Sequence, residues 1–348
     1  MLSNYNEKIR DEKKIINKEC IIRKRDTLLH VCLNSPGCRF RKYGSCTMCN
    51  YGQGRMISFD EIEKILQDIY TEINGMDSIL LGTLGSIFDP QEIPLKYLDS
   101  ICNMLNKTPV KVIIFETHYT FIDEKLCLWL KNKMPQKDIV IEMGLESIHD
   151  FVQKNCLNKI IKLDAFLDAI NLLHHFEISV TVNVFLGAPF LSAKEQITDT
   201  SQTILWAIEH GADSVVIFPA NIRKNTLLEY LYKEGSYERI SQWQVFEVLK
   251  RIPIHFLNRI YLSWYGDWLD ENENGQIENL PPYSCEACNS KWLSFYQEFL
   301  MEHCSKKRKQ LIDIIENENQ HCKCYQKYQK ILDKKPDSWE ECIKKIQI

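Results

Sequence analysis

Three cysteines with the spacing C-x7-C-x2-C lie in the segment SPGCRFRKYGSCTMCNYG at positions 35–52. They are Cys38, Cys46 and Cys49, and they follow directly after an apolar stretch that we expect to be a strand. Three thiolates on one loop can bind three irons of a [4Fe–4S] cluster and leave the fourth iron open for another ligand. The spacing therefore predicts an iron–sulfur cluster with one open position.

The residues around these thiols disfavour two simpler interpretations. Zinc is the competing metal, but a structural zinc site has four ligands and few other donors lie nearby. Three core thiols by chance are a poor explanation, because the segment contains glycines and is basic rather than apolar. Arg39, Arg41 and Lys42 would favour thiolates and offset the charge of a sulfide cluster.

A second group of cysteines lies toward the C-terminus. Its members are Cys285, Cys288, Cys304, Cys322 and Cys324. The first two form a C-x2-C pair, and zinc or an auxiliary iron–sulfur cluster would take this pair with two of the other three. Cys304 could instead be a helix-face residue, and His303 or His321 could replace a thiol. A second metal site is predicted, with the metal left open between zinc and iron.

The composition indicates a globular protein of a reducing compartment. The chain has 348 residues and 14 cysteines, and its N-terminus is too polar for a secretory signal. We therefore expect a cytoplasmic location, where disulfides are rare. Cys102 and Cys127 occur in helical apolar patterns and are predicted to be core residues.

Charge and hydropathy limit the partners of the chain. No apolar run of about 18 residues is present, so no membrane partner is expected. The formal net charge of −4 argues mildly against nucleic acid, because binding phosphates usually requires a basic surplus. The basic stretch 8–25 is interpreted as a solvated N-terminal face.

Apolar strands and amphipathic helices alternate through the middle of the chain. Strands are predicted at 27–34, 78–84, 111–117, 138–147, 178–187 and 214–220, and helices at 58–73, 93–105, 123–133, 163–176 and 193–211. The helix at 58–73 begins with the capping-box pair Ser58 and Glu61. The strands are almost continuously apolar, which is typical of a parallel sheet covered by helices.

These units predict an α/β fold of the partial (β/α)6 TIM-like barrel type. A closed eight-unit barrel would need two more units, of which 259–268 supplies at most one strand. No G-x-G-x-x-G follows the first strand, which disfavours a dinucleotide-binding sheet. We predict an N-terminal extension at 1–27, the barrel at 28–270 and a small Cys-rich module at 271–348.

The cysteine triad after the first strand resembles the radical S-adenosylmethionine (SAM) superfamily, with seven rather than three residues between the first two cysteines. Tyr51, close to the last cysteine, also resembles the family pattern. The resemblance implies that the open iron binds the methionine end of SAM. It further implies that an external electron donor drives cleavage to a 5′-deoxyadenosyl radical, which abstracts hydrogen from a substrate.

The same resemblance implies a set of SAM-binding residues at successive strand ends. Gly85 and Ser86 follow the second strand, and their backbone would meet the amino group of the methionine. Glu116 and Glu142 end the third and fourth strands, where carboxylates would face a cationic ligand, and Asn183 ends the fifth. Glu146 lies on the same strand as Glu142. Plain strand ends and turns are the simpler alternative for each residue, and no catalytic residue is assigned.

Four further stretches resemble one branch of the superfamily, typified by the archaeosine-forming lyase. They are GSIFDPQEIP, GLESIHDFVQKNCLNK, FLGAPFLSAKEQITD and NIRKNTLLEYLYKEGSY. This resemblance implies cleavage of a C–N bond in a lysine-modified deazaguanine of transfer RNA. A small molecule or a peptide is the alternative substrate.

A rival hypothesis belongs to another class of protein. Both cysteine groups could bind zinc and connect loops in a non-catalytic binding protein. It predicts a colourless protein, whereas the radical hypothesis predicts a brown anaerobic preparation with iron and sulfide.

Overall fold

The structure is a computed structural model that describes most of the chain. Described are residues 15–17, 20–25, 27–51, 54–263, 279–319, 321–332, 334, 336–337 and 341. Contacts divide the chain into two compact units. The first comprises Met1–Gly44, Tyr51–Gly144 and Lys162–Thr181, and the second comprises Ser45–Asn50, Leu145–Ile161 and Val182–Ile348.

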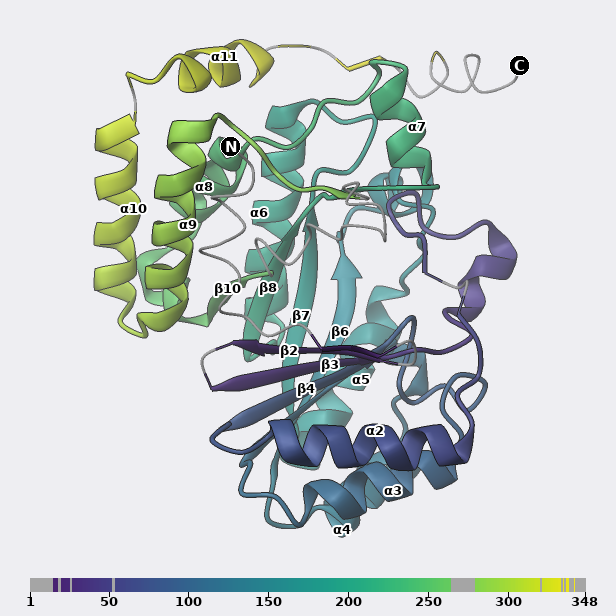
Figure 1. Cartoon of the computed structure of the whole chain (residues 1–348). Coiled ribbons are helices and arrows are strands. Elements are labelled where there is room, and N and C mark those ends of the chain that lie inside the picture. Colours follow the sequence, from purple (N-terminus) through teal and green to yellow (C-terminus); the bar gives the residue numbers. More distant parts are fainter. Residues whose placement is uncertain are drawn as a thin grey trace. The chain divides into compact units, whose positions relative to one another are not determined.

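The main sheet has the strand order β1-β2-β3-β4-β5-β6-β7-β8-β10 (Figure 1). Seven parallel strands, β3 to β8 and β10, form a partial TIM-like barrel with helices, which confirms the predicted fold class. The strand bounds are Ile15–Asn17 (β1), Cys20–Arg25 (β2), Leu28–Leu33 (β3), Ser78–Thr83 (β4), Val112–Thr117 (β5), Asp138–Glu146 (β6), Ser179–Leu186 (β7), Ser214–Pro219 (β8) and Ile260–Leu262 (β10).

The first unit packs helices on one face of its strands. In β3, Leu29, Val31 and Leu33 are buried while the residues between them are half-buried, as expected for a strand with helices on one side. Figure 1 shows α2, α3 and α4 along the same side of β3 and β4. The helices of this unit are α2 (Phe59–Glu72), α3 (Leu95–Leu105), α4 (Glu124–Lys133) and α5 (Leu163–His175).

Local sequence signals fix where these helices begin. The predicted capping box of α2 is present, with Ser58 accepting from the Glu61 amide and the Glu61 side chain accepting from the Ser58 amide. Helix α4 is capped by Asp123. Cys102 and Cys127 are fully buried, which confirms them as core residues, and burial raises their thiol pKa values to about 12 and about 11.

Two N-terminal strands were missed by the sequence analysis, which left 1–27 as an extension. Strand β2 pairs antiparallel with β3, and β1 pairs antiparallel with β2. They therefore add to the edge of a sheet that is otherwise parallel. The segment of β2, CIIRKR, is half basic and lacks the apolar continuity of the other strands.

The second unit contains the remaining helices and a small extra sheet. Strands β9 (Ile222–Arg223) and β11 (Asn279–Leu280) pair antiparallel. Aromatic rings form much of its C-terminal core, with Phe246 lying 4.7 Å from Trp292 and 4.8 Å from Phe295 between ring centroids. The helices are α6 (Ala193–Glu209), α7 (Leu227–Lys233), α8 (Gln242–Arg251), α9 (Glu286–Met301), α10 (Ser305–Asn319) and α11 (Lys323–Leu332).

The additional strand predicted at 259–268 is present in part. Strand β10 pairs parallel with β8, and residues 264–268 lie outside the described residues. The domain boundaries at 27 and 270 stay predictions. Among the helices that the structure describes, none is long and apolar enough to cross a membrane.

Candidate functional site

The loop after β3 carries Cys38, Cys46 and Cys49 as half-buried side chains without disulfides. Cys38 immediately precedes a short helical turn, η1 (Arg39–Tyr43), which ends at Gly44 with a positive φ of 98°. The Cys49 amide donates to the Cys46 carbonyl at 3.1 Å. Cys38 belongs to the first unit and the other two to the second, and their common role as cluster ligands stays a prediction.

Cys38 is fixed against the turn that follows β4. Its amide donates to the Leu84 carbonyl at 3.2 Å. A Cβ added at Gly85 would lie 2.7 Å from the Cys38 amide nitrogen and 2.2 Å from Glu92 Oε1. Only glycine therefore allows the two backbones to approach this closely. The predicted residue Gly85 thus contacts the predicted ligand Cys38.

Glu92 joins this turn to the cysteine loop, and the sequence analysis missed it. Its carboxylate accepts from the Ser35 hydroxyl at 2.7 Å, the Thr83 hydroxyl at 3.0 Å and the Ser86 amide at 2.9 Å. Burial raises the pKa of Glu92, while these hydrogen bonds lower it. Glu92 lies inside GSIFDPQEIP, so the family-like stretch was the signal that could have identified it.

Arg39 is neutralised by a carboxylate from the same turn. Its Nε lies 2.6 Å from Asp89, a second guanidinium nitrogen also contacts this carboxylate, and the side chain of Asp89 is 1% exposed. The hydrogen bond to Asp89 raises the pKa of Arg39. The charge of Arg39 is thus already paired, whereas Arg41 and Lys42 are exposed. Arg39 and Asp89 attach the cysteine loop to the β4 turn.

The Ser86 side chain connects the ends of β4 and β5. Its hydroxyl lies 2.5 Å from the Thr117 hydroxyl and accepts from the His118 amide at 3.0 Å. The Ile87 amide donates to the Glu116 carbonyl at 3.1 Å. These bonds fix the Gly85–Ser86 backbone beside the end of β5.

Glu116 and Glu142 are register partners on β5 and β6. A Cβ at Gly82 on β4 would lie 2.0 Å from Glu116 Oε2, so the glycine leaves room for this carboxylate. Burial and then the charge of Glu142 raise the pKa of Glu116 to about 8. Around neutral pH the pair therefore keeps a proton, which a cationic ligand would displace.

Glu146 is the last residue of β6, whereas the prediction that Asn183 ends its strand is wrong, because Asn183 lies inside β7. Glu146 lies 2.8 Å from Lys159 in an ion pair and has a φ of 65°. Asn183 lies on β7 in the second unit, and its Oδ1 is buried without a hydrogen-bond partner among the described residues. Asn183 thus offers an unused acceptor, which is the property expected of a ligand-binding side chain.

The end of β7 is fixed by the second unit. The Tyr237 hydroxyl donates to the Gly187 carbonyl at 2.8 Å, and a Cβ at Gly187, whose φ is 115°, would lie 2.7 Å from Ile240. Gln196 donates from Nε2 to the Ala188 carbonyl at 3.0 Å. The predicted turn after β7 therefore has a defined backbone position.

A histidine–carboxylate pair at the end of β6 was also missed. Asp199 on α6 lies 2.6 Å from His149 Nδ1 and accepts from the Ser147 hydroxyl at 2.5 Å. Burial raises the pKa of Asp199. The histidine lies in the family-like stretch GLESIHDFVQKNCLNK, but its spacing gave no signal of the distant Asp199.

In the C-terminal part the structure brings four of the five predicted cysteines together. The Sγ atoms of this four-cysteine group all lie within 4.8 Å of one another. Its members are Cys285, Cys288, Cys322 and Cys324. Cys304 is exposed and is not a member, and His303 and His321 are exposed as well.

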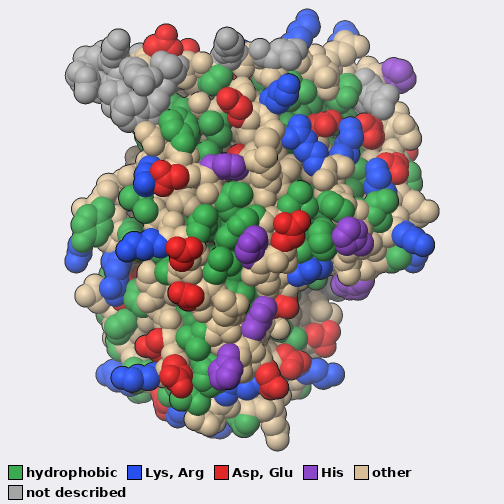
Figure 2. All heavy atoms as spheres, turned by 180° about the vertical axis from the view of Figure 1, so that it is seen from behind, with side chains coloured by type: hydrophobic (Ala, Val, Ile, Leu, Met, Phe, Trp, Pro, Cys, Tyr) green, Lys and Arg blue, Asp and Glu red, His purple; other side chains and the backbone are tan. Residues whose placement is uncertain are grey.

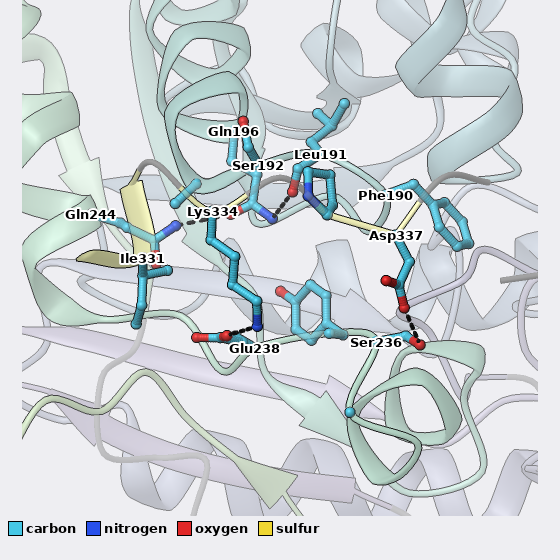
Figure 3. A pocket seen from close by; sticks show the side chains of 14 residues that line it. Phe190, Leu191, Ser192, Gln196, Ser236, Glu238, Gln244, Ile331, Lys334 and Asp337 are labelled. Atoms are coloured by element: carbon cyan, nitrogen blue, oxygen red, sulfur yellow. Dashed lines mark hydrogen bonds and ion pairs between the residues drawn. The ribbon is translucent and has the colours of Figure 1, made fainter. Parts of the chain in front are cut away.

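A small pocket lies at the start of α6 (Figure 3). Two contacts attach C-terminal residues to its rim: Lys334 pairs with Glu238, and the Ser236 hydroxyl donates to Asp337 at 2.9 Å. None of the SAM-binding or cysteine residues predicted from the sequence lines this pocket.

Comparison with known proteins gives two relatives that share a name and one that is called an uncharacterized protein, MJ0550 of Methanocaldococcus jannaschii. Archaeosine synthase subunit beta of Methanosarcina acetivorans is 24% identical over 269 residues, covering 76% of this chain and 75% of that protein. The protein of the same name from Thermococcus kodakarensis is 26% identical over 245 residues, covering 68% and 75%. No family model matches. The solved structure of Methanocaldococcus infernus Elp3 aligns with 71% of this chain and 60% of its own, at a TM-score of 0.48 and 16% identity.

The two curated relatives confirm the resemblance on which the sequence prediction rested. The chain is similar to the archaeosine-forming branch of the radical SAM superfamily. Their shared name agrees with the branch that the sequence analysis named from its family-like stretches.

Proposed function

We propose that Cys38, Cys46 and Cys49 bind a [4Fe–4S] cluster that is used with SAM to begin radical chemistry. One observation carries this proposal: the backbone at Cys38 lies so close to the β4 turn that a Cβ at Gly85 would be 2.7 Å from it. Three thiols on a loop anchored in this way form a donor set that suits three of the four irons. When bound, the cluster and SAM supply a 5′-deoxyadenosyl radical.

The chain's own residues would orient SAM and compensate its charge. SAM carries a sulfonium and an ammonium group, and Glu116 with Glu142 places two carboxylates side by side as register partners on neighbouring strands. Binding the cation would release the proton that Glu116 keeps, because an adjacent positive charge lowers a carboxyl pKa. The Gly85–Ser86 backbone would receive the amino group, and Asn183 Oδ1 would accept a further hydrogen bond.

For the substrate, the favoured candidate is a lysine-modified deazaguanine in transfer RNA, with cleavage of a C–N bond. Its support is the name shared by the two relatives, archaeosine synthase subunit beta. The net charge of −4 favours the alternative, a small molecule or a peptide. Figure 2 agrees with this alternative in that acidic and basic side chains intermingle on the face it draws. The proposal also includes an external electron donor that reduces the cluster and a cytoplasmic location for the protein.

Cleavage of SAM tests the cluster assignment. The full chain is reconstituted anaerobically with iron and sulfide, reduced, and mixed with SAM, and 5′-deoxyadenosine is measured by mass spectrometry. We expect product from the native chain and from Cys304→Ala, an exposed cysteine outside both groups, and none from Cys46→Ala. Equal product from both variants would contradict the assignment. Zinc without iron or sulfide in the native chain would favour the non-catalytic binding protein.

Nuclease treatment separates the two substrate classes. Transfer RNA carrying the lysine-modified base is offered before and after digestion with ribonuclease, and the amidine product is measured. Loss of product after digestion supports transfer RNA as the substrate. Product that persists on the released nucleoside supports a small molecule.

A further inference from the structure

The four-cysteine group has the spacing of ligands around a single ion. Cys324 Sγ lies 3.3 Å from both Cys288 Sγ and Cys322 Sγ, and Cys285 Sγ lies 3.7 Å from Cys322 Sγ. Tetrahedral zinc with Zn–S bonds of about 2.3 Å places its sulfurs ~3.8 Å apart. The separations of 3.3 Å and 3.7 Å are close to that geometry.

Two other uses of four thiols fit these distances less well. A disulfide requires an S–S distance of about 2.05 Å, and each of these sulfurs is further than that from its neighbours. In a four-iron cluster each thiolate binds a different iron, so the iron–sulfide core lies between the sulfurs and separates them more widely. All four sulfurs within 4.8 Å leave room for one metal ion but not for such a core.

We propose that Cys285, Cys288, Cys322 and Cys324 bind one zinc ion in a closed, structural site. Binding replaces the thiol protons, which leave to solvent, by four Zn–S bonds, with no change of oxidation state. All four positions around the ion are filled by the protein, so the ion has no open site for a substrate. This proposal does not depend on the catalytic cluster.

The surroundings of the thiols suit thiolate ligands. Cys285 is the N-cap of α9, and Cys322 lies just before the first residue of α11, so both face helix N-termini, where negative charge is stabilised. The Trp243 indole N–H donates to Cys324 Sγ at 3.3 Å, and the Cys288 amide donates to Cys285 Sγ at 3.5 Å. Hydrogen bonds of this kind orient metal ligands and offset their charge.

The ion would connect helices that are distant in the sequence. The thiols come from the starts of α9 and α11, and Trp243 comes from α8. The next residue, Gln244, donates to Gln196, which donates to the Ala188 carbonyl in the turn after β7. The zinc site therefore stabilises the α8, α9 and α11 assembly that positions this turn.

Metal analysis of a chain without the first cysteine group tests the proposal. The full-length triple variant C38A/C46A/C49A is purified, and its zinc, iron and acid-labile sulfide are measured. We expect zinc in a one-to-one ratio with the chain and no iron or sulfide. Iron with sulfide, iron alone, or no bound metal would each overturn the proposal. Cobalt substitution should give the visible ligand-field bands of a tetrahedral tetrathiolate site.

A pair of single variants locates the zinc. Cys324→Ser should lose the bound zinc and unfold at a lower temperature, whereas Cys304→Ser should keep both zinc and thermal stability. If Cys324→Ser does not fold, the metal content of the triple variant still decides the question. Zinc retained in a folded Cys324→Ser chain would contradict the assignment.

Discussion

The two cysteine groups use the same donor atom in opposite arrangements. The loop group has three thiols within 12 residues, and its first member is anchored to another turn by Gly85 and Glu92. The four-cysteine group has thiols from two helix starts, and its sulfurs already lie at the spacing of ligands to one ion. In the proposed functions, the first group would leave a coordination position for a reactant, whereas the second would be closed.

The two groups also differ in the contacts that hold their thiols in place. The loop group is connected to buried residues outside the loop, such as Thr83 and Glu92, whereas the four-cysteine group lies at two helix starts and accepts a hydrogen bond from the Trp243 indole. Changes near Gly85 should therefore remove iron without removing zinc.

Removing one cysteine from either group should remove the metal of that group and leave the other metal bound. Cys38→Ala should lose iron, sulfide and SAM cleavage while keeping zinc, because three thiolates are the minimum that binds the open cluster. Cys324→Ser should lose zinc and keep the iron–sulfur absorption. Elemental analysis with the visible spectrum checks both. Loss of both metals in either variant would contradict independent sites.

Gly85→Ala should weaken iron binding by roughly ten- to a hundredfold. The added methyl would meet the Cys38 backbone and Glu92, and overpacking of this kind costs about 1–3 kcal/mol. Iron titration of the anaerobic apo chain measures the effect. The exposed Glu63→Ala on α2 is the control, because this side chain lies outside the cysteine loop and the β4 turn. Equal iron binding in all three chains would show that the approach of the two backbones does not matter.

Glu92→Ala should lower the free energy of unfolding by about 3 kcal/mol. The change leaves the Ser35 and Thr83 hydroxyls and the Ser86 amide without their buried acceptor, and each such loss costs about 1–3 kcal/mol. Urea unfolding of the apo chain measures it. The exposed Glu63→Ala serves as control. A Glu92 variant as stable as the control would refute its positioning role.

Glu116→Gln should have the smallest effect, a changed pH dependence with both metals unaffected. The folded chain keeps a proton on Glu116 up to a pKa of about 8, whereas the unfolded chain releases it near 4.5. The contribution of Glu116 to the stability of the apo chain therefore falls as pH rises from about 4.5 to about 8. In Glu116→Gln this fall in stability with rising pH should be absent. Thermal unfolding temperatures measured across the same pH range check it. An unchanged slope would mean that Glu116 titrates normally.

The strand–helix alternation was readable from the sequence because each parallel strand is apolar along its length. The predicted strand at 111–117 and the helix at 123–133 agree with β5 and α4 to within one residue. Strand β2 was missed because three of its six residues are basic and its pairing depends on the distant β3.

The candidate site could be predicted only in part from the sequence. Residue type and spacing identify Cys285 and Cys288, but which downstream cysteines join them depends on how α9 and α11 pack. Apart from its place in the family-like stretch GSIFDPQEIP, nothing in the sequence indicated the contacts of Glu92, because its partners Ser35 and Thr83 look like ordinary loop and strand ends. Hydrogen bonds between residues that are distant in the chain leave no periodic pattern or motif in the sequence.

The most direct measurement is 5′-deoxyadenosine formation by the anaerobically reconstituted chain, compared among the native protein, Cys38→Ala and the matched Cys304→Ala. The account predicts product from the native protein and from Cys304→Ala, and none from Cys38→Ala. Absence of product from an iron-loaded native chain, or undiminished product from Cys38→Ala, would contradict it.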